Sequence, residues 1–371
     1  MKVPFVDLYA QYLTLKPQMD AAIAAVIQES AFIRGRFVAE FEKQYAAAYG
    51  VKHCVSVANG TDAIYIMLKM LGIGPGDEVV TSANTWIASS ETITQAGARV
   101  VFADVEPDYY DLDPAEVERK ITPRTKAVLA VHLLGQPADM ERLVNICQKR
   151  GIILLEDCAQ AHFATYNGKR VGRFGQAGTF SFYPGKNLGA YGDAGAIITD
   201  NDDLADRCRT FARHGAHATS KHDHLMEGVN SRMDGLQAAV LLAKLPHIQE
   251  WNAKRFQHAR RYTELLAKVP GVVTPKLRPN ATHIFHAYVV RVPRRNQVQQ
   301  HLNANGVATT IHYPTPLPFL KAYGYLGHTA SDFPVAHEHA AEILSLPLYP
   351  ELTDEMIQYV CAQLANGLDA P

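Results

Sequence analysis

The residues Ala177–Ile198, AGTFSFYPGKNLGAYGDAGAII, place one lysine, Lys186, directly after a short apolar run and inside a glycine-rich turn. Gly178–Phe182 has the small, aromatic and hydroxyl residues of a buried strand, and Pro184 and Gly185 end it. A lysine held beside a buried strand is shielded from water, which lowers its pKa and frees the amine as a nucleophile. Such an amine can form a Schiff base with an aldehyde cofactor. An exposed loop lysine is the alternative interpretation of this turn.

The composition is that of a soluble globular protein of about two domains. The chain has 371 residues, 47% hydrophobic and 20% charged, and its 36 basic residues balance 37 acidic ones. This balance argues against binding to nucleic acid or to an anionic membrane. Five widely spaced cysteines without a CxxC pair fit reduced thiols and argue against a disulfide scaffold or a zinc ribbon. With no signal peptide and no apolar run of membrane-spanning length, we expect a cytoplasmic protein.

Short apolar runs alternate with helical stretches through the first 200 residues. This alternation predicts an α/β fold with a mostly parallel, seven-stranded sheet that helices cover on both faces. In such sheets, ligands bind beyond the carboxyl ends of the strands. The expected strands are Val51–Val57, Glu78–Ser82, Val100–Val105, Ala127–His132, Ile152–Glu156, Gly178–Phe182 and Gly195–Thr199. The expected helices are Lys16–Ser30, Val38–Tyr49, Asp62–Leu71, Ser89–Ala96, Pro114–Lys120 and Met140–Lys149.

The pattern changes after residue 232. Residues 232–268 predict a long helix that Pro246 interrupts, which suits a hinge between domains. We therefore expect a large α/β domain of residues 1–245 and a small C-terminal α+β domain of residues 246–371, linked by that helix. The elements expected in the small domain are a strand at His283–Val292 and helices at Asn296–Asn305 and Glu355–Asn366.

Two candidate cofactor contacts follow the first two strands. Gly60 and Thr61 follow Val51–Val57 and open a helix, so their N–H groups can hold a phosphate. A plain N-cap turn at Asn59 is the alternative. Trp86 follows the second strand, where its ring can stack on a flat cofactor or pack in the core.

Two further candidates accompany the lysine. Asp157 ends the apolar run Ile152–Glu156, and a buried carboxylate needs a cationic partner such as a protonated pyridine nitrogen. A helix N-cap is the alternative for Asp157. Ser181, in the strand before Lys186, is a candidate phosphate ligand or a serine bonded to the backbone. A phosphate cradle, an aromatic ring, an acid and an amine in this order along the chain predict a pyridoxal phosphate (PLP) site, with pyridoxamine phosphate as its second form.

At this point the sequence resembles the DegT/DnrJ/EryC1/StrS family of sugar aminotransferases, which have the aspartate aminotransferase-like (type I) fold. The resemblance covers nearly the whole chain and includes the runs VANGTDAIYIML, GIGPGDEVVTSANTWIAS, LLEDCAQAH, FSFYPGKNLGAYGDAGAI, GVNSRMDGLQAAVL and TTIHYPTPLP. It implies that Lys186 is the Schiff-base lysine and proton shuttle, that Asp157 binds the pyridine nitrogen, and that Gln160 lies near the ring hydroxyl.

The resemblance also implies the remaining cofactor contacts and a dimer. Trp86 would cover the ring, while Gly60, Thr61 and Ser181 would bind the phosphate. Asn230 would reach the phosphate of the neighbouring subunit, so that a homodimer shares its active sites. For the sugar nucleotide, the family points to Tyr183, Lys221, His312 and Tyr313; a surface lysine without a role is the alternative for Lys221.

The run YPGKNLGAYGDAG most resembles the branch that aminates C3 of dTDP-linked 3-keto-6-deoxyhexoses, with glutamate as the amino donor. The resemblance implies deoxyaminosugar biosynthesis for a surface polysaccharide, such as the O-antigen of lipopolysaccharide, or for a glycosylated product. A C4 aminotransferase, a pyridoxamine-dependent sugar dehydratase and a non-enzymatic sugar-nucleotide-binding regulator are the alternatives. GIGPGD lacks the GxGxxG spacing of an NAD enzyme, and the histidines of HGAHATSKHDH lack the converging ligands of a zinc site, so we expect no metal.

Overall fold

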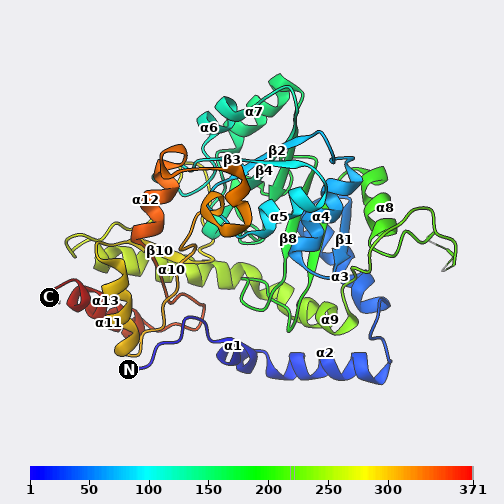
Figure 1. Cartoon of the computed structure of the whole chain (residues 1–371). Helices are drawn as coiled ribbons and strands as arrows, with labels where there is room; N and C mark the ends of the chain where they lie inside the picture. Colours follow the sequence, from blue (N-terminus) through cyan, green and yellow to red (C-terminus); the bar gives the residue numbers. More distant parts are fainter. Residues whose placement is uncertain (218, 221, 370–371) are drawn as a thin grey trace.

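The computed structural model describes residues 1–217, 219–220 and 222–369 and is built around one seven-stranded sheet (Figure 1). The strand order is β1-β9-β8-β5-β4-β2-β3, and only β9 runs against the other six. This confirms the mostly parallel sheet and the α/β fold. The strands are β1 (His53–Val57), β2 (Glu78–Ser82), β3 (Arg99–Ala103), β4 (Thr125–Val131), β5 (Ile153–Asp157), β8 (Ala177–Ser181) and β9 (Gly195–Thr199).

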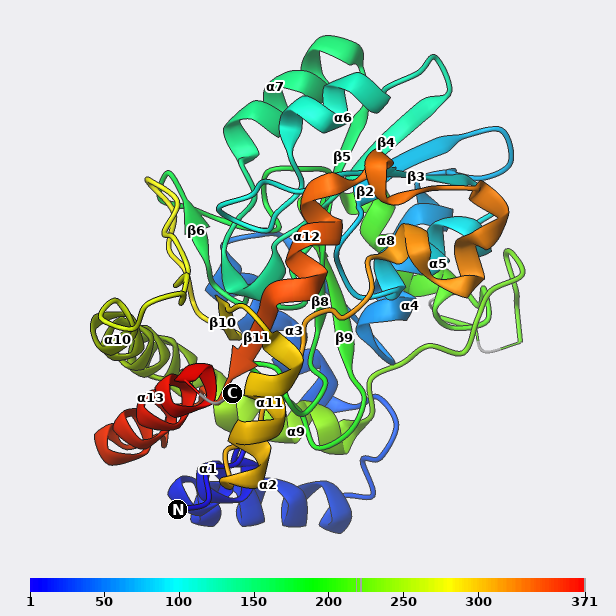
Figure 2. The same cartoon turned by 60° about the vertical axis from the view of Figure 1, so that its left-hand side comes forward.

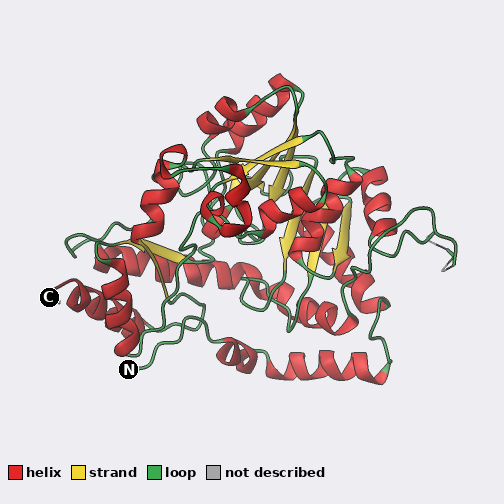
Figure 3. Ribbon diagram, in the orientation of Figure 1, coloured by secondary structure: helices red, strands yellow, loops and turns green. Residues whose placement is uncertain are grey.

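Helices cover both faces of the sheet (Figure 3). Successive strand residues point to opposite faces, so Val79 packs in the core beneath α4 and α5, whereas Val80 packs with Met140 of α7. One face thus carries α4 (Gly60–Met70), α5 (Ala88–Gln95) and α8 (Asp202–Phe211). The other carries α3 (Arg36–Tyr49), α6 (Pro114–Lys120), α7 (Met140–Arg150) and α9 (Gly235–Lys244).

A second, smaller core lies at the C-terminal end of the chain. Pro246 lies in the 3₁₀ turn Leu245–His247 between α9 and α10 (Ile248–Leu266), as the sequence predicted. Beyond α10, a two-stranded sheet packs with two helices (Figure 2), and the N-terminal Val3 joins the same core. These elements are β10 (Tyr288–Arg291), β11 (Ile343–Leu346), α11 (Arg295–Ala304) and α13 (Asp354–Asp369). The division into domains at residue 245 stays a prediction.

The strand expected over His283–Val292 is wrong in its first half. The backbone N–H groups of Ile284 and Ala287 donate to the loop that follows β4, at 2.9 Å and 3.4 Å, so these residues pair with a loop and not with a strand. The sequence analysis also missed six elements: α1 (Leu8–Thr14), α8, α12 (Pro334–Glu342), β11 and the two strands of a hairpin, β6 (Thr165–Tyr166) and β7 (Lys169–Arg170). Within the described ranges, no helix has both the length and the apolar surface to cross a membrane.

Strand β9 brings a glycine against the turn that opens α4. A Cβ atom on Gly195 would lie 2.3 Å from the carbonyl of Asn59 and 2.7 Å from the backbone nitrogen of Gly60. No side chain fits at such distances without moving the turn. The absence of a side chain at Gly195 therefore sets the position of the α4 N-terminus relative to the sheet.

We expect Gly195→Ala to lower the free energy of unfolding by about 2 kcal/mol or more, because an overpacked site forces the backbone to shift. Thermal or denaturant unfolding would measure this loss. The matched control is Gly324→Ala, since a Cβ there meets nothing within 4 Å. Equal stability of the two variants would contradict the close approach.

Candidate active site

The residues expected to bind phosphate lie where α4 begins. Asn59 caps the helix, its side chain accepting from the backbone N–H of Asp62 at 2.8 Å, which leaves the N–H groups of Gly60 and Thr61 at the helix N-terminus. A Cβ on Gly60 would lie 2.7 Å from the Cβ of Ser181. The structure thus brings together the three residues expected to bind phosphate, and the helix dipole favours an anion there.

Lys186 lies in a closed loop that leaves β8 and returns to β9. The Lys186 N–H donates to the carbonyl of Tyr183 at 2.8 Å, and the Ala190 N–H donates to that of Phe182 at 2.7 Å. Gly189 makes this closure possible, because a Cβ there would lie 2.3 Å from the carbonyl oxygen of Pro184. The lysine is therefore held in a tight turn, as the sequence predicted.

Burial lowers the pKa of Lys186 to about 8, and the negative charge of Asp157 opposes this effect. Much of the amine is therefore unprotonated at mildly basic pH, as a nucleophile requires. Burial, together with the positive charge of Lys186, lowers the pKa of His162 and of His312 to about 4. Both imidazoles are thus neutral beside the lysine.

Asp157 ends β5 and is only 6% exposed. Its Oδ2 accepts from the Ser89 hydroxyl at 2.9 Å, and its Oδ1 accepts from the Ala159 N–H at 3.1 Å. Each carboxylate oxygen can accept more than one hydrogen bond, so a protonated ring nitrogen can still bind. The helix N-cap alternative for Asp157 is excluded, because the described chain begins no helix immediately after it.

Gln160, Tyr313 and Trp86 form one group. The Gln160 Oε1 accepts from the Leu134 N–H at 2.7 Å, and its Nε2 donates to the Tyr313 hydroxyl at 3.0 Å. The ring of Tyr313 lies 5.7 Å from that of Trp86, centroid to centroid. The Trp86 side chain is 59% exposed, so it is not a core tryptophan and its indole is free to stack on a flat ring.

The other expected substrate contacts are only partly grouped with the lysine. Burial and the positive charge of Lys186 lower the pKa of His312. The Nδ1 of His312 lies 2.8 Å from the Ser345 hydroxyl. Tyr183 is 58% exposed beside the lysine loop. Asn230 is exposed and pairs with Arg213 in an isolated β-bridge, so its expected role depends on a second subunit. Lys221 lies outside the described residues.

A buried network of side-chain amides, which the sequence analysis missed, fixes the position of the lysine loop. Asn187 donates from Nδ2 to the Asn252 side chain at 2.9 Å and to the Ile284 carbonyl at 3.2 Å. Asn252 in turn donates to the carbonyl of His162 at 3.0 Å, and the ring of His162 donates to the carbonyl of Ser181 at 2.9 Å. The position of Asn187 directly after the lysine was the available signal, but its partners lie far away in the sequence.

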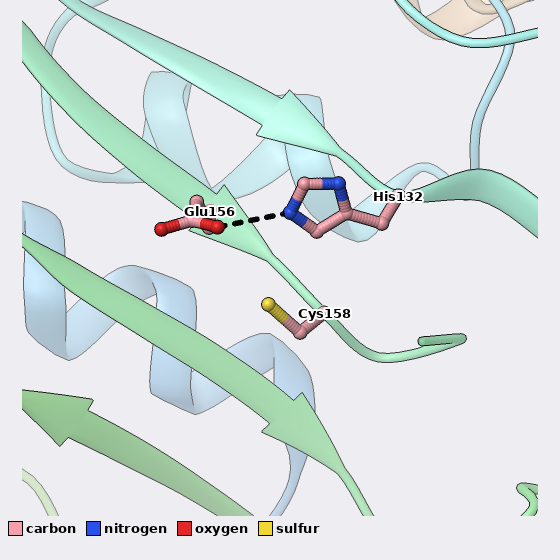
Figure 4. A group of neighbouring side chains, drawn as sticks. All are labelled: His132, Glu156 and Cys158. Atoms are coloured by element: carbon pink, nitrogen blue, oxygen red, sulfur yellow. Dashed lines mark hydrogen bonds and ion pairs between the residues drawn. The ribbon is translucent and has the colours of Figure 1, made fainter. Parts of the chain in front are cut away.

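His132, Glu156 and Cys158 lie together (Figure 4), with potential ligand atoms within 4.8 Å of one another. The Ala138 N–H donates to His132 Nδ1, so His132 Nε2 carries the proton and donates to Glu156 at 3.1 Å. Glu156 also accepts from the N–H groups of Gly172, Phe174 and Gly175. Burial raises the pKa of the Cys158 thiol. Because these groups are bonded or protonated, the cluster fits a structural network that braces β5, and not a metal site.

Residues 14–365 match the model of the DegT/DnrJ/EryC1/StrS aminotransferase family. The chain belongs to this family. Membership confirms the resemblance and the aspartate aminotransferase-like fold that it implied. It also means that the lysine turn, the acid and the phosphate cradle can be compared with the active sites of one family.

Three curated relatives align over nearly the whole chain. A "pleiotropic regulatory protein" of Geobacillus stearothermophilus is 45% identical over 99% of this chain and 98% of the relative. The dTDP-3-amino-3,4,6-trideoxy-α-D-glucose transaminase of Streptomyces venezuelae is 42% identical over 95% and 92%. The UDP-2-acetamido-2-deoxy-3-oxo-D-glucuronate aminotransferase of Pseudomonas aeruginosa is 42% identical over 98% and 100%.

Solved structures agree in fold and point to the cofactor. DesV of S. venezuelae, in complex with a ketimine intermediate, superposes with a TM-score of 0.96 at 40% identity, over 100% of this chain and 99% of DesV. NtdA of Bacillus subtilis, with bound pyridoxamine phosphate, gives 0.90 at 31% identity, over 100% and 86%. The present chain fits the same cofactor, because its glycine–serine cradle, buried carboxylate and shielded lysine match phosphate, ring nitrogen and aldehyde.

We expect the pKa of Lys186 to be near 8 in the apoenzyme, and competitive acetylation followed by mass spectrometry would measure it. Exposed lysines, with pKa values near 10.4, serve as the internal reference. Because the Asp157 charge favours the protonated amine, Asp157→Asn should lower the pKa of Lys186 further. A Lys186 that titrates with the exposed lysines would show that it is not shielded.

Proposed function

We propose that this protein is a PLP-dependent aminotransferase that moves an amino group from glutamate to a keto-sugar nucleotide. The observation that carries the proposal is the shielded amine of Lys186 within reach of the Asp157 charge, next to the Gly60–Ser181 cradle. When bound, the cofactor stores the amino group and stabilises negative charge on the carbon that loses its proton.

The side chains divide the work between binding and proton transfer. Gly60, Thr61 and Ser181 hold the phosphate, while Asp157 keeps the ring nitrogen protonated. With the cofactor bound, the Lys186 Nζ would take the proton from the Cα of the amino donor and deliver it to the C4′ carbon of the cofactor. Because one amine both holds the cofactor and shuttles the proton, positioning and general base catalysis come from a single loop.

We propose that the acceptor carbon is C3, most simply of a dTDP-linked 3-keto-6-deoxyhexose. The relatives from S. venezuelae and P. aeruginosa support this position, since their names specify a 3-amino and a 3-oxo sugar. They differ in nucleotide, dTDP in one and UDP in the other. The choice of dTDP therefore comes from the run YPGKNLGAYGDAG around the lysine, as does the setting in deoxyaminosugar biosynthesis.

We further propose that Tyr183, His312 and Tyr313 contact the sugar nucleotide and that two copies share their active sites. His312 and Tyr313 lie beside the lysine and beside Gln160, and Tyr183 borders the same loop. Asn230 is exposed and next to Ser231, whose hydroxyl donates to Asp62 of α4 at 2.6 Å. A surface this close to the cradle suits a contribution to the partner's phosphate.

A regulatory role is the second candidate, because the relative from G. stearothermophilus bears a regulatory name. Lys186 and Asp157 are both present in this chain with the geometry that the chemistry requires. A protein that only bound sugar nucleotides would need neither residue. Retention of Lys186 also disfavours a sugar dehydratase, whose relatives replace this lysine with histidine.

Lys186→Ala should abolish turnover and the visible absorption band of the bound cofactor while the fold persists. The physical reason is that no other amine replaces the Schiff-base partner of the aldehyde. Steady-state assays, absorption spectra and circular dichroism measure the three properties. Lys149→Ala, at an exposed site on α7, is the matched control and should retain all of them. Turnover by Lys186→Ala would refute the proposed mechanism.

A substrate panel would test the position and the sugar. We expect glutamate-dependent amination of a dTDP-3-keto-6-deoxyhexose with a kcat/KM at least about 10-fold above that for a dTDP-4-keto-6-deoxyhexose, because a misplaced acceptor carbon loses its alignment with the amine. The galacto and gluco epimers and a UDP-linked 3-keto sugar complete the panel, with product detection by mass spectrometry. Faster amination of the 4-keto sugar would favour the C4 alternative.

A further inference from the structure

The first turn of α5 presents two groups to the site, and the sequence analysis noted only one of them. Trp86 precedes the helix, and Ser89 follows three residues later, with the Ser89 N–H donating to the Trp86 carbonyl at 3.2 Å. Residues three apart lie on the same side of a helical turn. The indole is exposed toward solvent, whereas the Ser89 side chain is fully buried.

The Ser89 hydroxyl is directed at Asp157. It donates to Asp157 Oδ2 at 2.9 Å, and it lies 3.3 Å from the hydroxyl of Thr85. A serine hydroxyl has one proton, and a carboxylate can only accept, so Thr85 must be the donor in the second bond. The result is a buried relay from Thr85 through Ser89 to Asp157, in which each hydrogen bond strengthens the next.

We infer that Ser89 is a positioning residue that orients the Asp157 carboxylate toward the cofactor ring. Among the described residues, Asp157 otherwise accepts a hydrogen bond only from the Ala159 N–H, on Oδ1, so Ser89 is its only side-chain donor. The inference depends on the proposed function only in requiring that the protein binds PLP.

The neighbourhood of Asp157 contains few other groups that could produce the same effect. Among the described residues, Lys186, Cys158 and Tyr313 are titratable groups whose pKa responds to its charge. The imidazoles of His162, His286 and His312 face Lys186, and burial lowers the pKa of each, so all three are neutral at neutral pH. Burial raises the pKa of the Cys158 thiol and of the Tyr313 phenol, so both stay neutral at neutral pH. A substitution at Ser89 therefore affects the absorption band through Asp157, the ring nitrogen and Lys186.

The test compares Ser89→Ala with Ser90→Ala in the holoenzyme. Ser90 is the matched control, because it is also fully buried on α5 but bonds to the Ile87 carbonyl and the Tyr323 hydroxyl. For Ser89→Ala, the pH midpoint of the visible absorption band should rise by about 0.5 unit or more. Without the donor, Asp157 holds the shared proton more closely and leaves less positive charge on the ring beside the Lys186 nitrogen.

The same variant should weaken PLP binding about tenfold or more, as expected for one lost hydrogen bond to a charged group. Ser90→Ala should leave both the midpoint and the affinity unchanged, although both variants can lose thermal stability. Ser89→Cys, which keeps the side-chain volume but donates weakly, should shift the midpoint in the same direction and serves if the alanine variant does not fold.

A midpoint and an affinity equal to those of Ser90→Ala would overturn the positioning role. Failure of the proposed function looks different. In that case the wild-type protein shows the visible band and the Ser89 shift but aminates none of the keto sugars.

Discussion

The attraction between a shielded cation and a buried carboxylate is the interaction on which the site depends. Burial alone lowers the pKa of Lys186, and the charge of Asp157 limits that effect, so the amine titrates at about 8. Either group alone would be costly in this environment. Together they leave an amine that can react near neutral pH and an acid that can bind a cationic ring.

The architecture positions these two groups at the ends of two neighbouring strands. Asp157 comes from the end of β5, which the buried Glu156 braces through three backbone amides. Lys186 comes from the loop after β8, which Asn187 ties to α10 through Asn252. Because β5 and β8 are neighbouring parallel strands, their carboxyl ends meet at the same edge of the sheet. The site is therefore rigid on both sides, as catalysis requires.

Much of the fold could be predicted from local patterns. Five of the seven strands begin within one residue of their expected positions. The strands of a buried parallel sheet are near-continuous apolar runs, and such runs are easily recognised between helical stretches. The C-terminal part was harder. Residues 283–287 are apolar enough for a strand, yet Ile284 and Ala287 bond to the loop after β4, and no pattern within the segment shows that partner. The antiparallel direction of β9 depends likewise on contacts that form only in the folded chain.

The sequence by itself determined the kinds of group in the site, since one lysine in a closed turn, one acid after a strand and one glycine before a helix each have a local signature. Only the tertiary structure determined the hydrogen bonds, the contacts and the pKa values of those groups. The Ser89 donor to Asp157, the neutral His162 and His312 beside Lys186, and the contact of Gly60 with Ser181 join residues from 24 to 126 positions apart. The physical reason is that desolvation and hydrogen bonding depend on which side chains surround a group in space, whereas a motif records only which residues are neighbours along the chain.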